Sequence, residues 1–323
     1  MNVARAVLVR LGKLLGVVLI VSFLTFCLTK MLPGNPVQQL LQSEYTDLEL
    51  REAVERDLGL DKPFLSQYWN YITGVVTEGD LGKSYQQGTP TTTSLKAALP
   101  ATLQLMLMAQ FLSIAVSVPL ALYSAYRANT RVDKLITTGT FGLISIPGFA
   151  LAPFLVFVFA LRLGWFPAIG YDRITGPGGL SENLKSVALP VIVLSTGLTA
   201  VYTRLLRSDL IATLQEDFVL MARSKGLPTW HILLRHALRP SSFSLITVFG
   251  INFGALIGGT IIVERFFTIP GVGRLAVEAI PRREYLVLQG VVLLIATSFV
   301  VVNFITDLLY SVLDPRVRRA GAS

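Results

Sequence analysis

Two histidines are the residues of this chain best suited to acid–base or metal chemistry. His231 and His236 lie five residues apart, a spacing that places two side chains on different faces of an α-helix. A zinc hydrolase would carry His-Glu-x-x-His on one helix, and no carboxylate here has the spacing to complete such a site. The Gly-x-Ser-x-Gly elbow of serine hydrolases is also absent from the sequence. These observations argue against an enzyme of a known type.

Gly82-Lys83-Ser84 imitates the end of a phosphate-binding loop. That loop needs a further glycine five residues before the Gly-Lys pair, and Thr77 occupies this position. The sequence offers no other nucleotide-binding motif. The chain is therefore predicted to hold no ATP, cofactor or metal of its own.

Polar side chains inside apolar runs are functional candidates, because a polar group in a bilayer is costly. Asn303 and Asp307 are four residues apart and would share a helix face. An ion site is one interpretation of this pair, and a structural pairing with a nearby basic residue is the other. Gln104, Gln110 and Asn252 lie in other apolar runs.

A basic, amphipathic segment, Asp217–Pro240, lies between two apolar runs. Gly226-Leu227-Pro228 is expected to break it into two short helices, since glycine readily takes the left-handed conformation that ends a helix. Thr229 is expected to cap the second helix. Docking of another protein is one interpretation of this segment, and a basic loop resting on anionic lipid is the other.

The elements that must position these residues are long and apolar. Only 15% of the 323 residues are charged, 52% are hydrophobic and the mean hydropathy is +0.61, whereas about 25% of a soluble domain is charged. A helix that crosses a bilayer needs roughly 20 apolar residues. We therefore expect an all-α polytopic membrane protein with six spans. They lie near Val7–Leu32, Leu99–Tyr126, Leu135–Leu161, Leu184–Leu206, Phe243–Val263 and Leu286–Val312.

The charge pattern predicts how these spans are oriented. Lys and Arg gather in the loops that would share a face with the N-terminus, whereas Pro33–Ala98 holds more acidic than basic residues. Cytoplasmic loops carry the excess of basic residues, so both termini and the segment 212–240 are predicted to be cytoplasmic. The net charge of +8 is explained by this topology, and no nucleic-acid partner is expected.

Four regions follow from this reading. Residues 1–32 form an N-terminal signal-anchor span, residues 33–98 an extracytoplasmic segment, residues 99–313 a five-helix core, and residues 314–323 a cytoplasmic tail. Within the external segment, Glu44–Leu60 is expected to be helical and Lys62–Thr93 to be loop. Gly254-Ala-Leu-Ile-Gly258 in the fifth span is a small-residue face that lets another helix approach closely, in this chain or in a partner.

Several motifs together resemble the permease subunits of bacterial ABC importers, in the dipeptide and oligopeptide (peptide/nickel) group of the "B" subunit type. In the basic segment, Ala222-Arg-Ser-Lys-Gly226 resembles the coupling motif of that superfamily, although Leu220-Met221 replaces the usual Glu-Ala. The resemblance covers nearly the full length. Its other motifs are Leu32-Pro-Gly-Asn-Pro36, Leu58-Gly-Leu-Asp-Lys-Pro63, Gly79-Asp-Leu-Gly-Lys-Ser84, Leu99-Pro-Ala-Thr-Leu103, Glu264-Arg-Phe-Phe-Thr-Ile-Pro-Gly-Val-Gly273, Asp307-Leu-Leu-Tyr310 and Asp314-Pro-Arg316.

The resemblance implies a type I importer permease fold in the bacterial inner membrane. It implies a second, homologous permease subunit, two ATP-binding subunits that hold ATP and Mg²⁺, an extracytoplasmic solute-binding protein and a peptide substrate. The residues expected to couple to the ATPases are Asp217, Ala222, Arg223, Lys225, Gly226, Leu227 and His236. The residues expected along the pathway or at an outer gate are Asn252, Glu264, Phe267, Pro270, Asn303 and Asp307.

An alternative from another class is a stand-alone, ion-coupled carrier or channel with Asn303 and Asp307 as its ion site. It predicts uptake driven by an ion gradient rather than by ATP. A membrane scaffold without solute flux is a third possibility. Peptide, nickel-chelate and glutathione importers look alike in this subunit, so the sequence leaves the substrate open.

Overall fold

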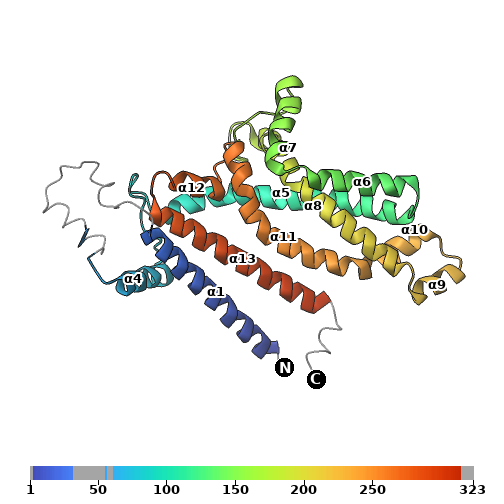
Figure 1. Ribbon diagram of the computed structural model, residues 1–323, viewed down its shortest axis with the longest axis horizontal. Helices are drawn as coiled ribbons and strands as arrows, with labels where there is room; N and C mark the ends of the chain where they lie inside the picture. Colours follow the sequence, from blue (N-terminus) through green and yellow to red (C-terminus); the bar gives the residue numbers. More distant parts are fainter. Residues whose placement is uncertain (1–2, 32–54, 57–60, 314–323) are drawn as a thin grey trace.

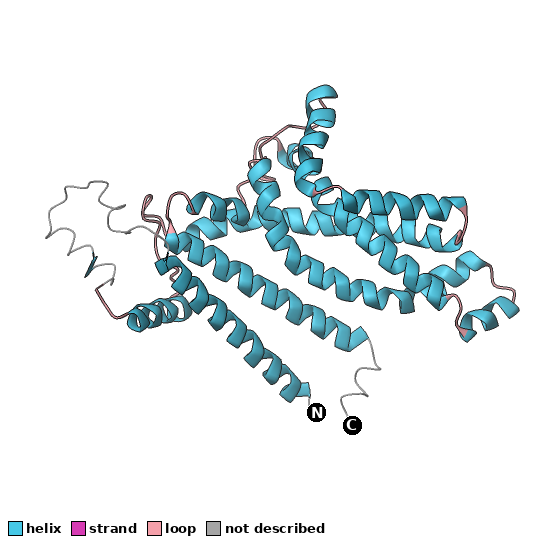
Figure 2. Cartoon of the chain, in the orientation of Figure 1, coloured by secondary structure: helices cyan, strands magenta, loops and turns pink. Residues whose placement is uncertain are grey.

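The computed structural model describes residues 3–31, 55–56 and 61–313, and within these ranges the chain is built from helices (Figures 1 and 2). The all-α prediction is confirmed. The helical elements, in chain order, are α1 (Val3–Met31), α4 (Phe64–Thr77), α5 (Thr91–Tyr126), α6 (Arg131–Ser145), α7 (Gly148–Leu155), the π-helical η1 (Val156–Arg162), α8 (Gly179–Thr213), α9 (Asp217–Ser224), α10 (Thr229–Ile232), the π-helical η2 (Leu233–Ala237), α11 (Leu238–Phe266), α12 (Val272–Ala279) and α13 (Tyr285–Leu313).

Six membrane spans are present if one bent pair of helices is counted as a span. Five are single helices of sufficient length and hydropathy: α1, α5, α8, the continuous Thr229–Phe266 helix, and α13. The sixth consists of α6 followed by α7 and η1, which meet at an angle of 97°. The prediction of six spans is confirmed, but the third, expected as one helix, is broken at its middle.

The break follows from Pro147. A proline ring clashes with the backbone of the preceding residue in the α conformation and drives that residue to extended geometry. Ile146 is extended, with φ −90° and ψ 113°, and α6 therefore ends at Ser145. Gly148 then starts α7 in a new direction.

Two expectations for the external segment were wrong. Lys62–Thr93 was expected to be loop, but Phe64–Thr77 forms α4, and α5 begins at Thr91 rather than at Leu99. Pro90 immediately precedes α5, and its fixed φ suits the start of a helix. The expected helix Glu44–Leu60 lies outside the described residues except for residues 55 and 56.

The spans form a bundle in which neighbours in space follow a simple order. α5 packs along α8, α8 against α11, α11 against α13, and α13 against α1. Figure 1 shows α9 and α10 on the side where α1 starts and α13 ends, with α4 and α12 on the opposite side. This arrangement agrees with the predicted topology, in which the α9 side faces the cytoplasm.

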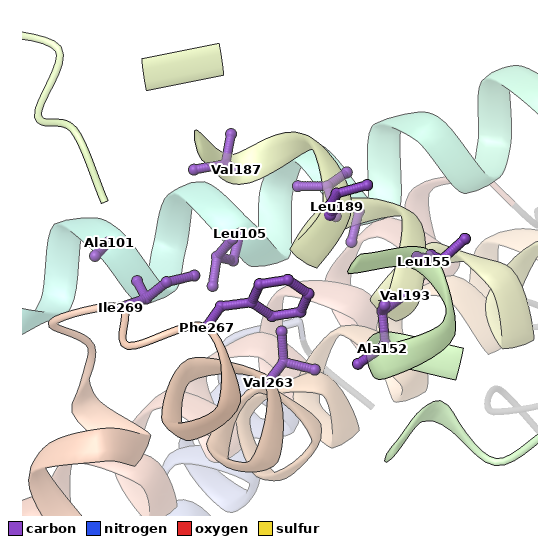
Figure 3. Packing of buried hydrophobic residues seen from close by; sticks show 12 residues of the cluster. Ala101, Leu105, Ala152, Leu155, Val187, Leu189, Val193, Val263, Phe267 and Ile269 are labelled. Carbon is purple, nitrogen blue, oxygen red and sulfur yellow. The ribbon is translucent and has the colours of Figure 1, made fainter. Parts of the chain in front are cut away.

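The largest buried cluster lies where α5, α7, α8 and the end of α11 meet (Figure 3). Leu105 of α5 and Leu189 of α8 are almost completely buried in it. The ring of Phe267, which follows α11, points into the same cluster. The cluster therefore fixes the outer end of α11 against α5 and α8.

Candidate functional site

The segment predicted to be cytoplasmic begins with α9, whose C-terminal end is closed by a Schellman turn. Gly226 has φ +76°. Its N–H donates to the Arg223 carbonyl at 2.9 Å, and the Leu227 N–H donates to the Ala222 carbonyl at 3.3 Å. These are the two bonds of that motif, which needs a left-handed residue at this position. The prediction that Gly226 ends the first helix is confirmed.

α9 has one packed side and one open side. Val219 and Ala222 are buried against Ile232 of α10, with Leu227 packed at the edge. On the open side Phe218, Leu220 and Met221 are exposed, Met221 by 63%. The predicted coupling residues on the open side are Asp217, Arg223, Lys225 and Gly226. Ala222, by contrast, faces the packing within the segment.

The second half of the segment differs from the expectation. Thr229 does not cap a separate helix, because Pro228 occupies the N-cap position and Thr229 is already helical. α10 and η2 run without a break into α11. The ring of Trp230 packs edge-on against Tyr126, at the end of α5, with centroids 5.7 Å apart. The segment is thus one short helix, α9, followed by the first turns of the fifth span.

The two histidines are closer than their spacing suggested. The ring centroids of His231 and His236 lie 5.9 Å apart, because the π-helical turn η2 between them adds a residue to the turn. Both are exposed. Within the described residues no group of three His, Cys, Asp or Glu side chains could hold a metal.

A buried ion pair lies between the spans, near the end of α8 that leads to α9. Arg207 of α8 donates from Nε and Nη2 to the two carboxylate oxygens of Asp133 on α6, at 2.6 and 2.7 Å. Ser124 of α5 also donates to this carboxylate, as does the Asn129 N–H. Asp133 is 3% exposed. The carboxylate therefore ties α5, α6 and α8 together six residues before α8 ends.

A hollow of about 520 Å³ opens between the α6–α7 break, α8 and α11. Asn252, one of the predicted pathway residues, lies on its wall. The α11 side of the wall also carries Ala255, Gly259 and Ile262, which share a helix face by their spacing. No charged side chain is among the lining residues in the described part of the chain. Non-helical backbone at membrane depth is tolerated where it lines such a cavity, which suits the break at Pro147.

The outer end of α11 is joined to α12 by Glu264, a fully buried carboxylate. Glu264 accepts from Thr102 Oγ1 at 2.6 Å and from the Arg274 N–H at 3.0 Å. Thr102 Oγ1 in turn accepts from the Val272 N–H at 2.9 Å. Free N–H groups at a helix start favour such acceptors. Glu264 and Thr102 thus cap α12 from two other helices.

The glycines of this motif are needed for the same contact. A Cβ on Gly271 would lie 2.2 Å from the Glu264 carboxylate carbon, and one on Gly273 would lie 2.6 Å from Ile261 Cα. Thr268 adopts φ +56° at the turn that ends α11. Of the other predicted gate residues, Phe267 is buried in the core while Pro270 is exposed.

A second carboxylate anchors the loop before α5, and the sequence analysis missed it. Glu284 accepts from Ser84 Oγ, the Tyr85 N–H and the Gln86 N–H, each at 2.8 Å. Burial and the adjacent Glu284 carboxylate raise the pKa of the Tyr85 hydroxyl. Glu284 has no local motif, because its partners lie about 200 residues earlier in the sequence. Asp133 follows the N-cap Thr130 at capping-box spacing, but its pairing with the distant Arg207 could not be read from the sequence.

The remaining polar candidates in the spans have partners within the chain or lie outside the described side chains. Tyr171 and Asn183 hydrogen-bond to Gln104, and Tyr202 donates to Gln110 at 2.9 Å. Asn303 is partly buried on α13, whereas the side chain of Asp307 lies outside the described part of the structure. The expected Asn303–Asp307 pairing therefore stays a prediction.

The small-residue face of α11 is used in two ways. A Cβ on Gly254 would lie 2.6 Å from the Phe299 ring of α13, so close packing here is within the chain. A Cβ on Gly258 would meet no atom within 4 Å. The Gly258 end of the predicted face is therefore open.

Comparison with known proteins gives consistent matches over nearly the whole chain. Residues 117–319 match the family described as the binding-protein-dependent transport system inner membrane component, and residues 3–106 match its N-terminal region. The glutathione transport system permease protein GsiC of Shigella flexneri is 34% identical over 312 residues, which cover 97% of this chain and 98% of the relative. A Brucella abortus protein whose name places it, provisionally, in a peptide transport system as a permease is 35% identical over 313 residues, with the same coverage.

The fold has a solved counterpart. The inward-facing MetNI methionine ABC transporter contains a chain that matches with a TM-score of 0.56 at 14% identity, covering 69% of this chain and 97% of the other. At this identity the match concerns the fold alone. It identifies the bundle as the type I importer permease fold.

Proposed function

Because the chain belongs to the family of binding-protein-dependent transport system inner membrane components, it is a multi-pass inner-membrane permease subunit of an ABC importer, and we propose that its cargo is peptides. GsiC is named for glutathione, a tripeptide, and the Brucella relative for peptides. The uncharged wall of the hollow supports this proposal. A fixed charge there would hold one peptide terminus and slow release. The relatives give no support to a stand-alone carrier.

Membership in this family implies ATPase partners and a partner permease. In our proposal the complex contains a distinct, homologous second permease, two ATP-binding subunits and an extracytoplasmic solute-binding protein. The ATP-binding subunits hold ATP and Mg²⁺, and this chain is not catalytic. It forms half of the translocation pathway.

The observation that carries the coupling proposal is the open side of α9. A helix that exposes Phe218, Leu220 and Met221 beside charged residues has the composition of a docking surface, in which apolar anchors are surrounded by polar groups. We place this side in a groove of an ATP-binding subunit, with Asp217, Arg223 and Lys225 making the charged contacts. His236, which is exposed on η2, is the remaining residue that we assign to this contact.

Movement of α9 reaches the membrane along two connections. Through its own packed side α9 contacts α10, which continues as α11. Through residues 214–216 it follows α8, which the Asp133–Arg207 pair holds to α5 and α6. Closure of the ATPases would therefore shift these helices as rigid bodies around the hollow, giving alternating access.

The test is ATPase activity of the purified complex in nanodiscs, with and without its binding protein and a mixed peptide pool. Wild-type complex should be stimulated only when both are present. Gly226→Asp should abolish this stimulation because it adds a side chain and a negative charge on the open side of α9, where we place the ATP-binding subunit. Gly164→Asp is the matched control, since Gly164 has φ +66° and equally open surroundings but lies far from α9 in the sequence.

Met221→Glu supplies a second variant that leaves the fold of α9 intact, because Met221 is exposed on its open side. It should weaken copurification of the ATP-binding subunit and lower stimulated activity. If both variants keep full stimulation, the coupling site lies elsewhere. If no peptide pool, added together with the binding protein, stimulates the ATPase activity of the wild-type complex, the proposal that the cargo is peptides is wrong.

A further inference from the structure

Helix α4 has three distinct faces and no charged residue between Phe64 and Thr77. One face is polar, with Gln67, Asn70 and Thr73. A second face is aromatic and meets α1. The third face is apolar and is covered by no part of the described chain. We therefore ask which molecule covers this third face.

The aromatic face joins α4 to α1 through ring contacts. The centroids of Phe26 and Phe64 lie 5.2 Å apart, and those of Phe23 and Tyr68 lie 5.1 Å apart. Tyr71 stacks on Phe26 at 6.2 Å. Edge-on and offset rings at these distances attract each other beyond the area that they bury. α4 is therefore fixed to α1, and its position relative to the bilayer follows from that of α1.

The depth of α4 in the bilayer follows from the position of its contacts along α1, measured from Met31. Tyr68 Oη donates to the Leu19 carbonyl at 3.3 Å. Leu19 lies twelve residues before Met31, the last residue of α1, which corresponds to about 18 Å along the helix axis. Half of the hydrocarbon thickness is about 15 Å. Measured from Met31, the Tyr68 hydroxyl thus reaches about the middle of the bilayer. The rings of Phe64 and Tyr71 contact Phe26, which lies only about 7.5 Å from that end, so α4 lies beside the outer half of α1.

The apolar face presents Leu65, Trp69 and Val76, which are 69%, 67% and 77% exposed. Their spacing of four and seven residues places them on one stripe. The adjacent surface of α1 is also exposed and apolar, with Ile20 at 60% and Leu24 at 54%. The stripe on α4 thus continues the outer surface of a membrane span.

We propose that α4 is embedded in the outer leaflet of the membrane, with Leu65, Trp69 and Val76 against the acyl chains and the polar face toward the headgroups. The continuity with α1, the depth of Tyr68 and the lack of charge all favour lipid over a soluble partner. α4 then holds the outer half of α1 from the lipid side. This inference rests on the membrane location of the chain and is independent of the peptide and coupling proposals.

The test uses spin labels on single cysteines in a Cys27→Ser background, with the full complex in lipid nanodiscs. Leu65→Cys, Trp69→Cys and Val76→Cys report the apolar face, and Asn70→Cys is the matched control on the polar face of the same helix. Collision rates are measured with oxygen, which concentrates in lipid, and with a nickel chelate, which stays in water. The three apolar positions should favour oxygen several-fold more than Asn70 does.

Three results would overturn the proposal. An oxygen-to-nickel ratio at the three positions equal to that at Asn70 would place the stripe in water. Low collision rates with both reagents would mean that protein, such as a second permease subunit, covers the stripe. Labels that are exposed to water alone and become immobile with binding protein would identify a docking surface instead. Neither transport nor ATPase activity enters the readout, so failure here leaves the proposed function untouched.

Discussion

Replacing Asp133 with Asn should destabilise the bundle and loosen its coupling to the ATPases. Ser124 donates to one carboxylate oxygen and the Asn129 N–H to the other, so Asn, with a single acceptor oxygen, keeps only one of these bonds and leaves the Arg207 guanidinium without a counter-charge. Removing one partner of a buried pair costs about 3–5 kcal/mol. The side chain of Arg207 is 24% exposed, so water compensates part of its charge and we expect a cost of about 3 kcal/mol, at the lower end.

The assay is a double-mutant cycle on thermal unfolding of the complex, with Asp133→Asn, Arg207→Gln and the double variant. At 2–4 °C per kcal/mol, the first variant should lower the midpoint by about 6–12 °C. The midpoint of the double variant should fall by clearly less than the sum of the two single decreases, because residues in direct contact have coupling energies of about 0.5–3 kcal/mol. Additive losses, or a midpoint unchanged in Asp133→Asn, would refute the view that this pair ties α5, α6 and α8 together.

The remaining predictions concern turns and caps. Gly226→Ala should cost about 1 kcal/mol, because the left-handed conformation penalises a Cβ; Gly226→Asn should cost less, and equal thermal midpoints for the two variants would contradict this. Gly271→Ala should cost about 2 kcal/mol by overpacking against Glu264, while Gly139→Ala, in open space on α6, should leave the midpoint unchanged or higher. Thr268→Gly should raise the midpoint slightly by relieving strain of about 1 kcal/mol, and a lower midpoint would show that the threonine side chain contributes instead. Glu284→Gln should lower the free energy of unfolding by about 2 kcal/mol, because an amide cannot accept from all three donors. Hydrogen exchange at the Tyr85 and Gln86 amides should then be faster. Unchanged protection there would argue against Glu284 as the anchor of this loop.

The spans and the end of α9 were predictable because they depend on local chemistry. A run of apolar residues is visible in the sequence, and Gly226 is a local signal for a helix end. The direction of a helix after a break is not local. Pro147 is a local signal for a helix end, but the 97° turn depends on α8 and α11, against which α7 packs.

The errors have similarly specific causes. His231 and His236 were placed on different faces because the α-helical period was assumed, and the π-helical turn changes that period. α4 was predicted to be loop because its polar, aromatic and aliphatic residues lie on three separate narrow faces. The sequence therefore shows no single apolar repeat with the helical period. Pro90 before Thr91 was an available signal for the early start of α5.

The continuous helix from Thr229 to Phe266 makes the fifth span a lever arm. Its 38 residues extend about 57 Å, from the α9 contact at one end to the Glu264 cap of α12 at the other. In the proposed mechanism, a movement of α9 is carried along this unbroken backbone to the Glu264 cap at the outer end, and the π-helical turn η2 and the bend of α11 (Figure 1) are the points at which the arm can flex.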